Sequence, residues 1–469
     1  MAIKQHSRNM IFIFLGDAAA RLLGFLAIAY LARILDKPAF GIMNIGLAVL
    51  NYTLLIGNSG LALSGTRAVA GNDKALSFLT GRIIVTRMLL SFLAYIVSGL
   101  ILYLFVSQPD VPEITMVFLL FLFPMAMMLD WYFQGKQEMG TMAFGRFLGM
   151  LCYLLFILIF VRANDDLIMT AWGWVAGGVV NGLWLLFVFR KQSYQITFRW
   201  QGANLFQLWK NAFPLGVASL ISQVVLQFPI IYLGWFYTTT DAGIFSAAFR
   251  ATALLLIFDR VFYTIFFPVI SRNAAASAER SQEIVKRVLK VVVVSGLCIS
   301  LLAIFMAEWL IFFIFSEKYQ EAILVFQILT GYFALTLTNS VVGYTLVGLN
   351  EEKTFTRALF LGLCFFFAAI FALPGQWGLT GVAIALVLYQ IVAVIIMSLK
   401  LGSFMQINFK RHLVLPFFAA FLVILPALYS LEIILPLKIS LLILFCFPLL
   451  ARAGGIKWED VLYFKKVLI

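Results

Sequence analysis

Long apolar stretches, separated by short polar breaks, run along the whole sequence. A helix that crosses a bilayer takes about 20 mostly apolar residues, and most of the stretches reach that length. The polar breaks divide them into fourteen expected helices: 10–35, 39–65, 82–107, 113–134, 139–162, 166–190, 209–236, 241–271, 288–315, 321–349, 354–374, 377–401, 411–431 and 433–452. The pattern therefore predicts an all-α, polytopic membrane protein.

The amino-acid composition strengthens this prediction. The 469 residues are 63% apolar and only 12% charged, whereas ordinary soluble domains carry about 25% charged residues. So few charges cannot cover a water-soluble surface, which excludes a soluble enzyme. The first apolar stretch contains Asp17 and Arg21 and is too long for a signal peptide, so we expect it to be a retained first helix.

The net charge of +13 becomes informative once the cations are assigned to loops. Cytoplasmic loops of membrane proteins carry an excess of Lys and Arg. With the N-terminus in the cytoplasm, most of the 34 lysines and arginines fall in inner loops, and acids collect in the outer loops. A wrong helix count would scramble this alternation. The charges therefore predict fourteen helices with both termini cytoplasmic, and no nucleic-acid partner.

An internal repeat accompanies this topology. Residues 9–47 align without gaps on 211–249, so that Gly41-Ile42 meets Gly243-Ile244. The match pairs helices six spans apart, and units with an even number of spans insert the same way up, with the substrate path between them. We therefore predict three parts: an N-terminal lobe at 1–205, a C-terminal lobe at 206–405, and two extra helices with a cytoplasmic tail at 406–469.

Five arginines lie inside the apolar segments, where a charge costs at least about 2.5 kcal/mol at the helix centre. They are Arg21, Arg87, Arg146, Arg250 and Arg260. A guanidinium stays charged and binds a phosphate or carboxylate through two hydrogen bonds, so each is a candidate for binding an anionic substrate. The alternatives are pairing with a nearby acid, as for Arg21 with Asp17, and snorkelling to the interface, for Arg87 and Arg146.

Other polar residues in the spans suggest further roles. Asp17, Asp130 and Asp259 are candidates for coupling to H⁺ or Na⁺, with a structural pairing to Arg as the alternative. Gln223 and Gln227 are four residues apart on one helix, so they share a face and can bind sugar hydroxyls or another helix. The scattered cysteines and the absence of a phosphate-binding loop predict no catalytic residue, metal site or cofactor.

Several motifs, in this order and at this spacing, resemble one group of transporters. They are Ala32-Arg33-Ile34-Leu35-Asp36-Lys37-Pro38-Ala39-Phe40-Gly41-Ile42, Tyr132-Phe133-Gln134-Gly135, Phe213-Pro214-Leu215 and Asp241-Ala242-Gly243-Ile244-Phe245-Ser246-Ala247-Ala248. The group is the Wzx-type polysaccharide flippases of the MOP (MATE-like) superfamily. The chain departs from it at Gln227, near which relatives often carry an Asp in the seventh helix.

The resemblance implies a two-lobed bundle of fourteen helices in the bacterial inner membrane. It implies translocation of an undecaprenyl-diphosphate-linked oligosaccharide from the inner to the outer leaflet, by alternating access through a cationic cleft and without covalent chemistry. A polysaccharide polymerase and chain-length proteins are candidate partners, besides the membrane lipids. A lipid II flippase and an ion-coupled multidrug exporter of the same superfamily remain as alternatives. The loops between spans leave little room for a membrane-bound glycosyltransferase or polymerase domain.

Overall fold

The described part of the protein is built from α-helices with short 3₁₀ and π-helical segments, and no strand occurs in it. A computed structural model describes residues 2–71, 76–106, 108, 110–192, 196–197, 205–274, 278–430, 434–457 and 459–460. Within those ranges it places side chains from residue 16 onward, except 76, 211, 213–222 and 260–281. Contacts divide the chain into two compact units, Met1–Ser246 and Ala247–Ile469, each described separately below. The boundary between these units falls inside the helix Thr239–Ala274. The predicted lobes at 1–205 and 206–405 are a different division, which follows from the sequence repeat.

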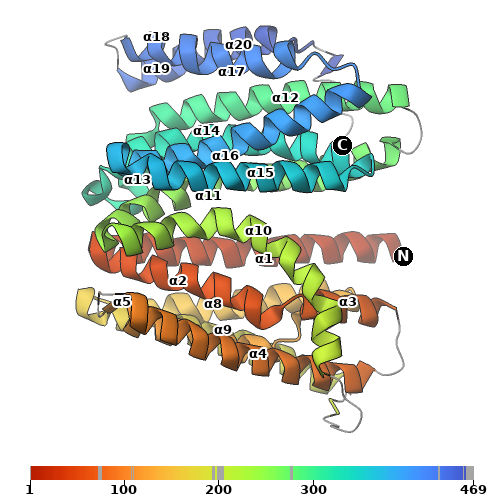
Figure 1. Ribbon diagram of the computed structural model, residues 1–469, viewed down its shortest axis with the longest axis vertical. Helices are drawn as coiled ribbons and strands as arrows, with labels where there is room; N and C mark the ends of the chain where they lie inside the picture. The colour runs from red at the N-terminus through yellow and green to blue at the C-terminus, as the bar shows by residue number, and fades with distance from the viewer. Residues whose placement is uncertain are drawn as a thin grey trace. The chain divides into compact units, whose positions relative to one another are not determined.

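The first unit is a bundle of long helices that lie side by side (Figure 1). In it α1 packs on α8, α8 on α9, and α2 on α4, α5 and α10. Its helices are α1 (Ala2–Ile34), α2 (Lys37–Asn58), α3 (Leu61–Ala70), α4 (Leu76–Phe105), α5 (Asp110–Leu119), α6 (Leu122–Met127), α7 (Asp130–Gly135), α8 (Met139–Phe160), η1 (Asn164–Asp166), α9 (Leu167–Lys191), α10 (Leu205–Phe236) and the first turns of α11 (Thr239–Ala274).

The second unit is built around α14, which packs between α12 and α16. The last helices, α17 to α20, pack on α12 over one large apolar cluster. The helices after α11 are α12 (Ala278–Phe305), α13 (Ala307–Phe315), η2 (Glu317–Tyr319), α14 (Ala322–Gly348), α15 (Glu352–Ala372), α16 (Pro374–Phe404), η3 (Lys410–Val414), α17 (Leu415–Phe418), η4 (Ala419–Ile424), α18 (Leu425–Ser430), α19 (Leu435–Leu441), η5 (Leu442–Cys446) and α20 (Phe447–Ala453).

The prediction of an all-α, multi-pass membrane protein is confirmed. Within the described residues, 12 helical stretches are long and apolar enough to cross a bilayer, and each overlaps one predicted segment. The remaining two predicted segments coincide with α1 and α10, whose apolar runs include residues outside the described side chains. The structure is therefore compatible with the fourteen predicted spans.

Some predicted spans are broken rather than continuous. The predicted span 39–65 divides at Ser59 and Gly60, which both have positive φ angles, into α2 and α3. The predicted span 113–134 divides into α5, α6 and α7. Hydropathy did not reveal the breaks within 113–134 because residues 119–129 are continuously apolar, whereas Asn58-Ser59-Gly60 is a turn sequence that marks the first break.

The repeat has a structural counterpart where the start of α11 meets α2. A Cβ on Gly41 would lie 1.8 Å from the carbonyl oxygen of Thr239, and one on Gly243 would lie 2.2 Å from that of Lys37. Only glycine permits such close backbone approach. The two glycines that the 202-residue offset equates therefore pack against each other, and both helices begin at equivalent caps, Asp36 and Thr238.

Candidate functional site

Three charged side chains from distant parts of the sequence meet in the first unit. The Arg146 guanidinium on α8 donates through Nη1 to Asp17 Oδ1 on α1 at 3.0 Å. On its other side, Arg146 Nε lies 3.9 Å from Oδ1 of Asp130, the first residue of α7. One cation thus lies beside two carboxylates, so the three side chains together carry one negative charge when all are ionised. We call these three residues the Arg146 triad.

The Arg146 triad lies within the span rather than at its edge. Arg146 is seven residues into α8, about 10 Å along the helix axis. The side chains are nevertheless accessible: Arg146 is 43% exposed, Asp17 36% and Asp130 31%. Charges at this depth are retained in membrane proteins where they line a wet cavity or serve transport. The triad therefore has the properties of an open polar site.

Arg21 extends this polar face by one turn. It follows Asp17 by four residues on α1, so both project from the same side of the helix, and its side chain is exposed. The i, i+4 spacing suggested an ion pair between them, but Asp17 is paired with Arg146 instead. An exposed guanidinium therefore lies next to the triad.

Arg87 has different surroundings. Its side chain is buried, with 4% of its surface exposed. It donates to the carbonyl oxygen of Met128 at 3.0 Å and to that of Met125 at 2.7 Å. These carbonyls lie at the break between α6 and α7, where helical hydrogen bonding stops and, in a membrane, the free backbone groups need partners from the protein. The contacts of Arg87 thus support the broken helix that carries Asp130.

The other predicted substrate-binding residues are distributed over both units. Gln223 and Gln227 are half-buried on α10 in the first unit. The side-chain oxygen of Gln223 is buried without a hydrogen-bond partner among the described residues, so it can accept one from a ligand. Arg250 is half-buried on α11 in the second unit, and the Arg260 side chain lies outside the described residues.

Asp259 belongs to a polar network in the second unit that the sequence analysis missed. Its carboxylate lies close to Ser340 on α14, and its Oδ1 is buried without a hydrogen-bond partner among the described residues. Next to Ser340, the Asn339 amide donates to Gln390 on α16 at 2.6 Å, and Gln390 donates to Thr336 at 2.9 Å. These uncharged polar residues lie within apolar segments, and that position was the signal that could have identified them. The structure thus places Asp259 in a different polar cluster from Asp17 and Asp130.

The Arg146 triad consists of charged groups that can exchange ion partners. Among the described side chains, no group of three or more His, Cys, Asp or Glu is arranged to hold a metal. A guanidinium between two carboxylates can instead change partners when another anion arrives, because its fork binds phosphate as well as carboxylate. The two carboxylates would then have lost their counter-charge and would bind a proton or a monovalent cation more tightly.

The known proteins that this chain resembles are described by names that concern polysaccharides or glycans. The profile of the family described as "Polysaccharide biosynthesis protein" matches residues 7–274. The chain is 22% identical over 401 residues to a "Putative O-antigen transporter" of Shigella dysenteriae, covering 83% of the chain and 98% of that relative. It is 20% identical over 415 residues to a "Probable low-salt glycan biosynthesis flippase Agl15" of Haloferax volcanii, covering 86% of the chain and 85% of the relative.

A solved structure shares the fold. The structure described as "Lipid II flippase MurJ, inward closed conformation" superimposes with a TM-score of 0.71, covering 96% of this chain and all of the other. The sequences are only 14% identical, so the likeness concerns the fold alone. Its extent shows that the last two predicted spans, as well as the repeated helices, have counterparts in a known transporter fold.

Proposed function

Because the chain belongs to the polysaccharide biosynthesis protein family, we propose that it moves a lipid-linked oligosaccharide from the inner to the outer leaflet of the bacterial inner membrane. The names of its relatives, an O-antigen transporter and a glycan flippase, support this cargo. The fold supports alternating access as the mechanism. Both termini face the cytoplasm in this proposal, and a polysaccharide polymerase and chain-length proteins act on the delivered product.

The assignment of this function to particular residues rests on one observation, which is that the side chains of the Arg146 triad are exposed inside the span. The cargo is a lipid diphosphate, and its charged head must cross a region where an unpaired charge is costly. Arg146 and the neighbouring Arg21 supply cations that bind diphosphate through paired hydrogen bonds. We assign these two residues to the head group in the first unit, with Arg250 and Arg260 on α11 as the cations of the second.

The uncharged part of the cargo requires polar groups of another kind. Sugar hydroxyls both donate and accept hydrogen bonds, and Gln side chains can do the same. In this proposal Gln223 and Gln227 contact the oligosaccharide, and the unpaired oxygen of Gln223 accepts from a hydroxyl. Arg87 acts indirectly, because its hydrogen bonds to α6 and α7 hold Asp130 in position.

Transport against a gradient requires a driving ion, and we propose H⁺ or Na⁺. When the diphosphate takes Arg146, Asp17 and Asp130 lose their counter-charge and bind the ion. When the cargo leaves, Arg146 returns and displaces it. Binding of cargo and ion are then linked reciprocally. Asp259 and the polar network beside it provide a second ion-binding candidate, in the other unit.

The test compares two exposed arginines on the same helix. Arg21 lies inside the span and Arg33 at its outer end. Proteoliposomes carrying the full chain and a fluorescent undecaprenyl-diphosphate oligosaccharide report how fast the label reaches the outer leaflet. We expect Arg21→Gln to slow this rate about 10- to 100-fold, the effect of losing one charged hydrogen-bond pair, and Arg33→Gln to leave it unchanged. Equal rates for Arg21→Gln and the wild type would contradict the proposed site.

The same assay separates the alternative functions. A lipid II flippase would transport lipid II and not the oligosaccharide lipid, and a multidrug exporter would transport an organic cation. Collapsing the proton gradient and the Na⁺ gradient in turn identifies the driving ion. A rate that is unaffected by either treatment would argue against coupling through Asp17 and Asp130.

A further inference from the structure

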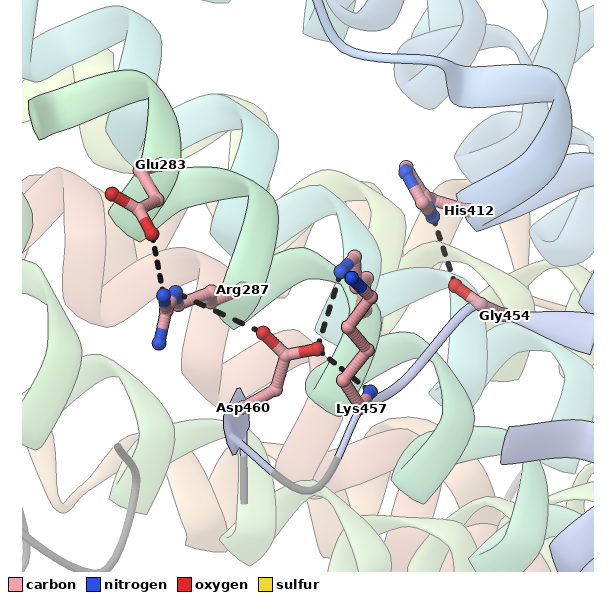
Figure 2. Close-up of polar contacts among 7 residues, drawn as sticks. Glu283, Arg287, His412, Gly454, Lys457 and Asp460 are labelled. Atoms are coloured by element: carbon pink, nitrogen blue, oxygen red, sulfur yellow. Dashed lines mark hydrogen bonds and ion pairs between the residues drawn. The ribbon is translucent and has the colours of Figure 1, made fainter. Parts of the chain in front are cut away.

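One face of α12, near the end predicted to be cytoplasmic, is unusually rich in charge. Glu283, Lys286, Arg287 and Lys290 follow one another at helical spacing, so their side chains project from the same side of the helix. The segment that follows α20 covers this face and places Asp460 among the charges (Figure 2). Sequence reasoning assigned these cations only to topology.

Asp460 contacts two of the three cations on that face, and together with Glu283 it balances their charge. Its Oδ2 lies 3.1 Å from Lys290 Nζ and accepts from the backbone N–H of Lys457 at 2.9 Å. Its Oδ1 lies 3.8 Å from Arg287 Nε, and Arg287 is also paired with Glu283. Asp460 and Lys290 are both buried. The interaction fastens Asp460 to α12.

Two neighbouring cations have no carboxylate partner among the described residues. Lys286 and Arg411 both lie close enough to the His412 imidazole to act on it electrostatically, and neither forms an ion pair among the described residues. The backbone at Arg411 is held on both sides, because the Arg411 N–H donates to Asn408 Oδ1 at 3.0 Å and the His412 imidazole donates through Nδ1 to the carbonyl oxygen of Gly454 at 2.8 Å (Figure 2). Since a carbonyl can only accept, Nδ1 carries the hydrogen. Among the described residues, two cations at the junction of α12, η3 and the segment after α20 thus have no ion-pair partner.

The surroundings of this junction suit a lipid rather than a soluble partner. Two spans meet at this junction, Lys410–Ser430 with its start and Leu435–Ala453 with its end, and both are mostly exposed and apolar. Large side chains on their free faces include Val414, Leu415, Phe418, Leu422 and Val423. A membrane-spanning surface of this kind contacts acyl chains. A molecule with a negative head and two acyl chains would therefore meet cations and apolar surface in the correct order along the membrane normal.

We propose that the junction of α12, η3 and the segment after α20 binds an anionic phospholipid of the inner leaflet. The phosphate lies between Lys286 and Arg411, and the acyl chains lie along the exposed face of α17 and η4. The bound lipid stabilises the last two spans against α12, beside the Asp460 contact. This site is separate from the Arg146 triad, and binding can be measured without transport.

The experiment titrates dioleoylphosphatidylglycerol into the purified full chain in a neutral detergent and counts bound lipids by native mass spectrometry. A cation near the surface contributes about 1 kcal/mol to anionic-lipid binding. We therefore expect Lys286→Gln to weaken binding about fivefold, and Lys286→Gln with Arg411→Gln about 30-fold. The matched control is Lys353→Gln, an exposed cation at the predicted cytoplasmic start of α15, and it should leave binding unchanged.

Three results would overturn the proposal. One is equal binding of phosphatidylglycerol by the wild type and the double variant. Another is equal binding of neutral phosphatidylcholine and phosphatidylglycerol by the wild type. The third is a site filled by inorganic phosphate as readily as by the lipid, which would make it a free-anion site. If the double variant does not fold, the fivefold effect of Lys286→Gln alone, compared with Lys353→Gln, decides the question.

Discussion

In the described part of the protein, two clusters bring together cations and carboxylates that are far apart in the sequence, and the two clusters differ in exposure. In the Arg146 triad, all three side chains are about one-third exposed or more, and the second contact of Arg146 is 3.9 Å long. In the cluster around Asp460, the carboxylate is 5% exposed and its Lys290 partner 9%. Similar chemical groups therefore occupy an open site in one place and a closed one in the other.

This difference separates a site that can change partners from one that cannot. Removing a buried carboxylate from its cation leaves an uncompensated charge, which is strongly unfavourable. An exposed pair contributes little, because solvent replaces each partner. The Arg146 triad can therefore exchange a carboxylate for a phosphate at small cost, whereas Lys290 and Asp460 form a fixed structural contact.

The largest effect should follow from breaking the closed cluster. Asp460→Ala leaves Lys290 buried without its partner, and we expect a loss of about 3–5 kcal/mol in the free energy of unfolding. Thermal or denaturant unfolding of the purified full chain, followed by tryptophan fluorescence, measures the loss. The control is the double change Lys290→Met with Asp460→Leu, which removes both charges and should be much closer to the wild type. A mild effect of Asp460→Ala would mean that Lys290 reaches water.

The next effect concerns transport rather than stability. Arg146→Gln removes the cation that we assign to the diphosphate, and we expect the flipping rate to fall about 10- to 100-fold. Arg146→Lys keeps the charge but not the planar fork, so it should recover part of the rate. The proteoliposome assay measures both variants, and circular dichroism checks that each is folded. Wild-type transport by Arg146→Gln would remove the triad from the substrate path.

A smaller effect tests the openness of the triad directly. Asp17→Asn removes one ion pair between partly exposed groups, so the free energy of unfolding should change by less than about 1 kcal/mol. Raising the salt concentration should reduce the difference further, because exposed charges are screened. Unfolding curves at low and high salt for both proteins provide the measurement. A loss as large as that of Asp460→Ala would show that the triad is a closed structural cluster.

The sequence predicted the general plan because the bilayer imposes strong rules on composition and length. Twelve predicted spans have counterparts of sufficient length among the described residues, and the repeat equated Gly41 with Gly243, although their contact came only from the structure. Five arginines stood out because charges are rare in apolar segments. Their partners could not be derived: Asp17 is four residues from Arg21, yet pairs with Arg146, 129 residues away. Helical spacing gives neighbours on one helix only, and partners on other helices depend on packing.

The smallest expected effect comes from a third ion pair, between Glu351, just before α15, and Lys400, in the last turns of α16. Glu351 Oε1 lies 3.3 Å from Lys400 Nζ, and Glu351 Oε2 accepts a hydrogen bond from the Thr354 hydroxyl at 2.7 Å. The hydrogen bond from Thr354, followed by the charge of Lys400, holds the pKa of Glu351 below its ordinary value of 4.5. The folded state therefore favours the ionised form. Its contribution to stability is present above pH 4.5 and is lost as the pH falls through the lowered pKa.

Glu351→Gln isolates this contribution, because glutamine retains an acceptor for Thr354 but does not titrate. We expect the thermal midpoints of the wild type and Glu351→Gln to differ slightly near neutral pH and to converge on acidification below pH 4.5. Melting curves of both proteins at the same pH give the difference in thermal midpoint. The titration of the other carboxylates affects both proteins equally and cancels in that difference. A difference that grows towards acid pH would reverse the predicted sign. Convergence of the midpoints would place the Glu351 pair, with side chains 26% and 40% exposed, with the open Arg146 triad and apart from the closed contact at Asp460.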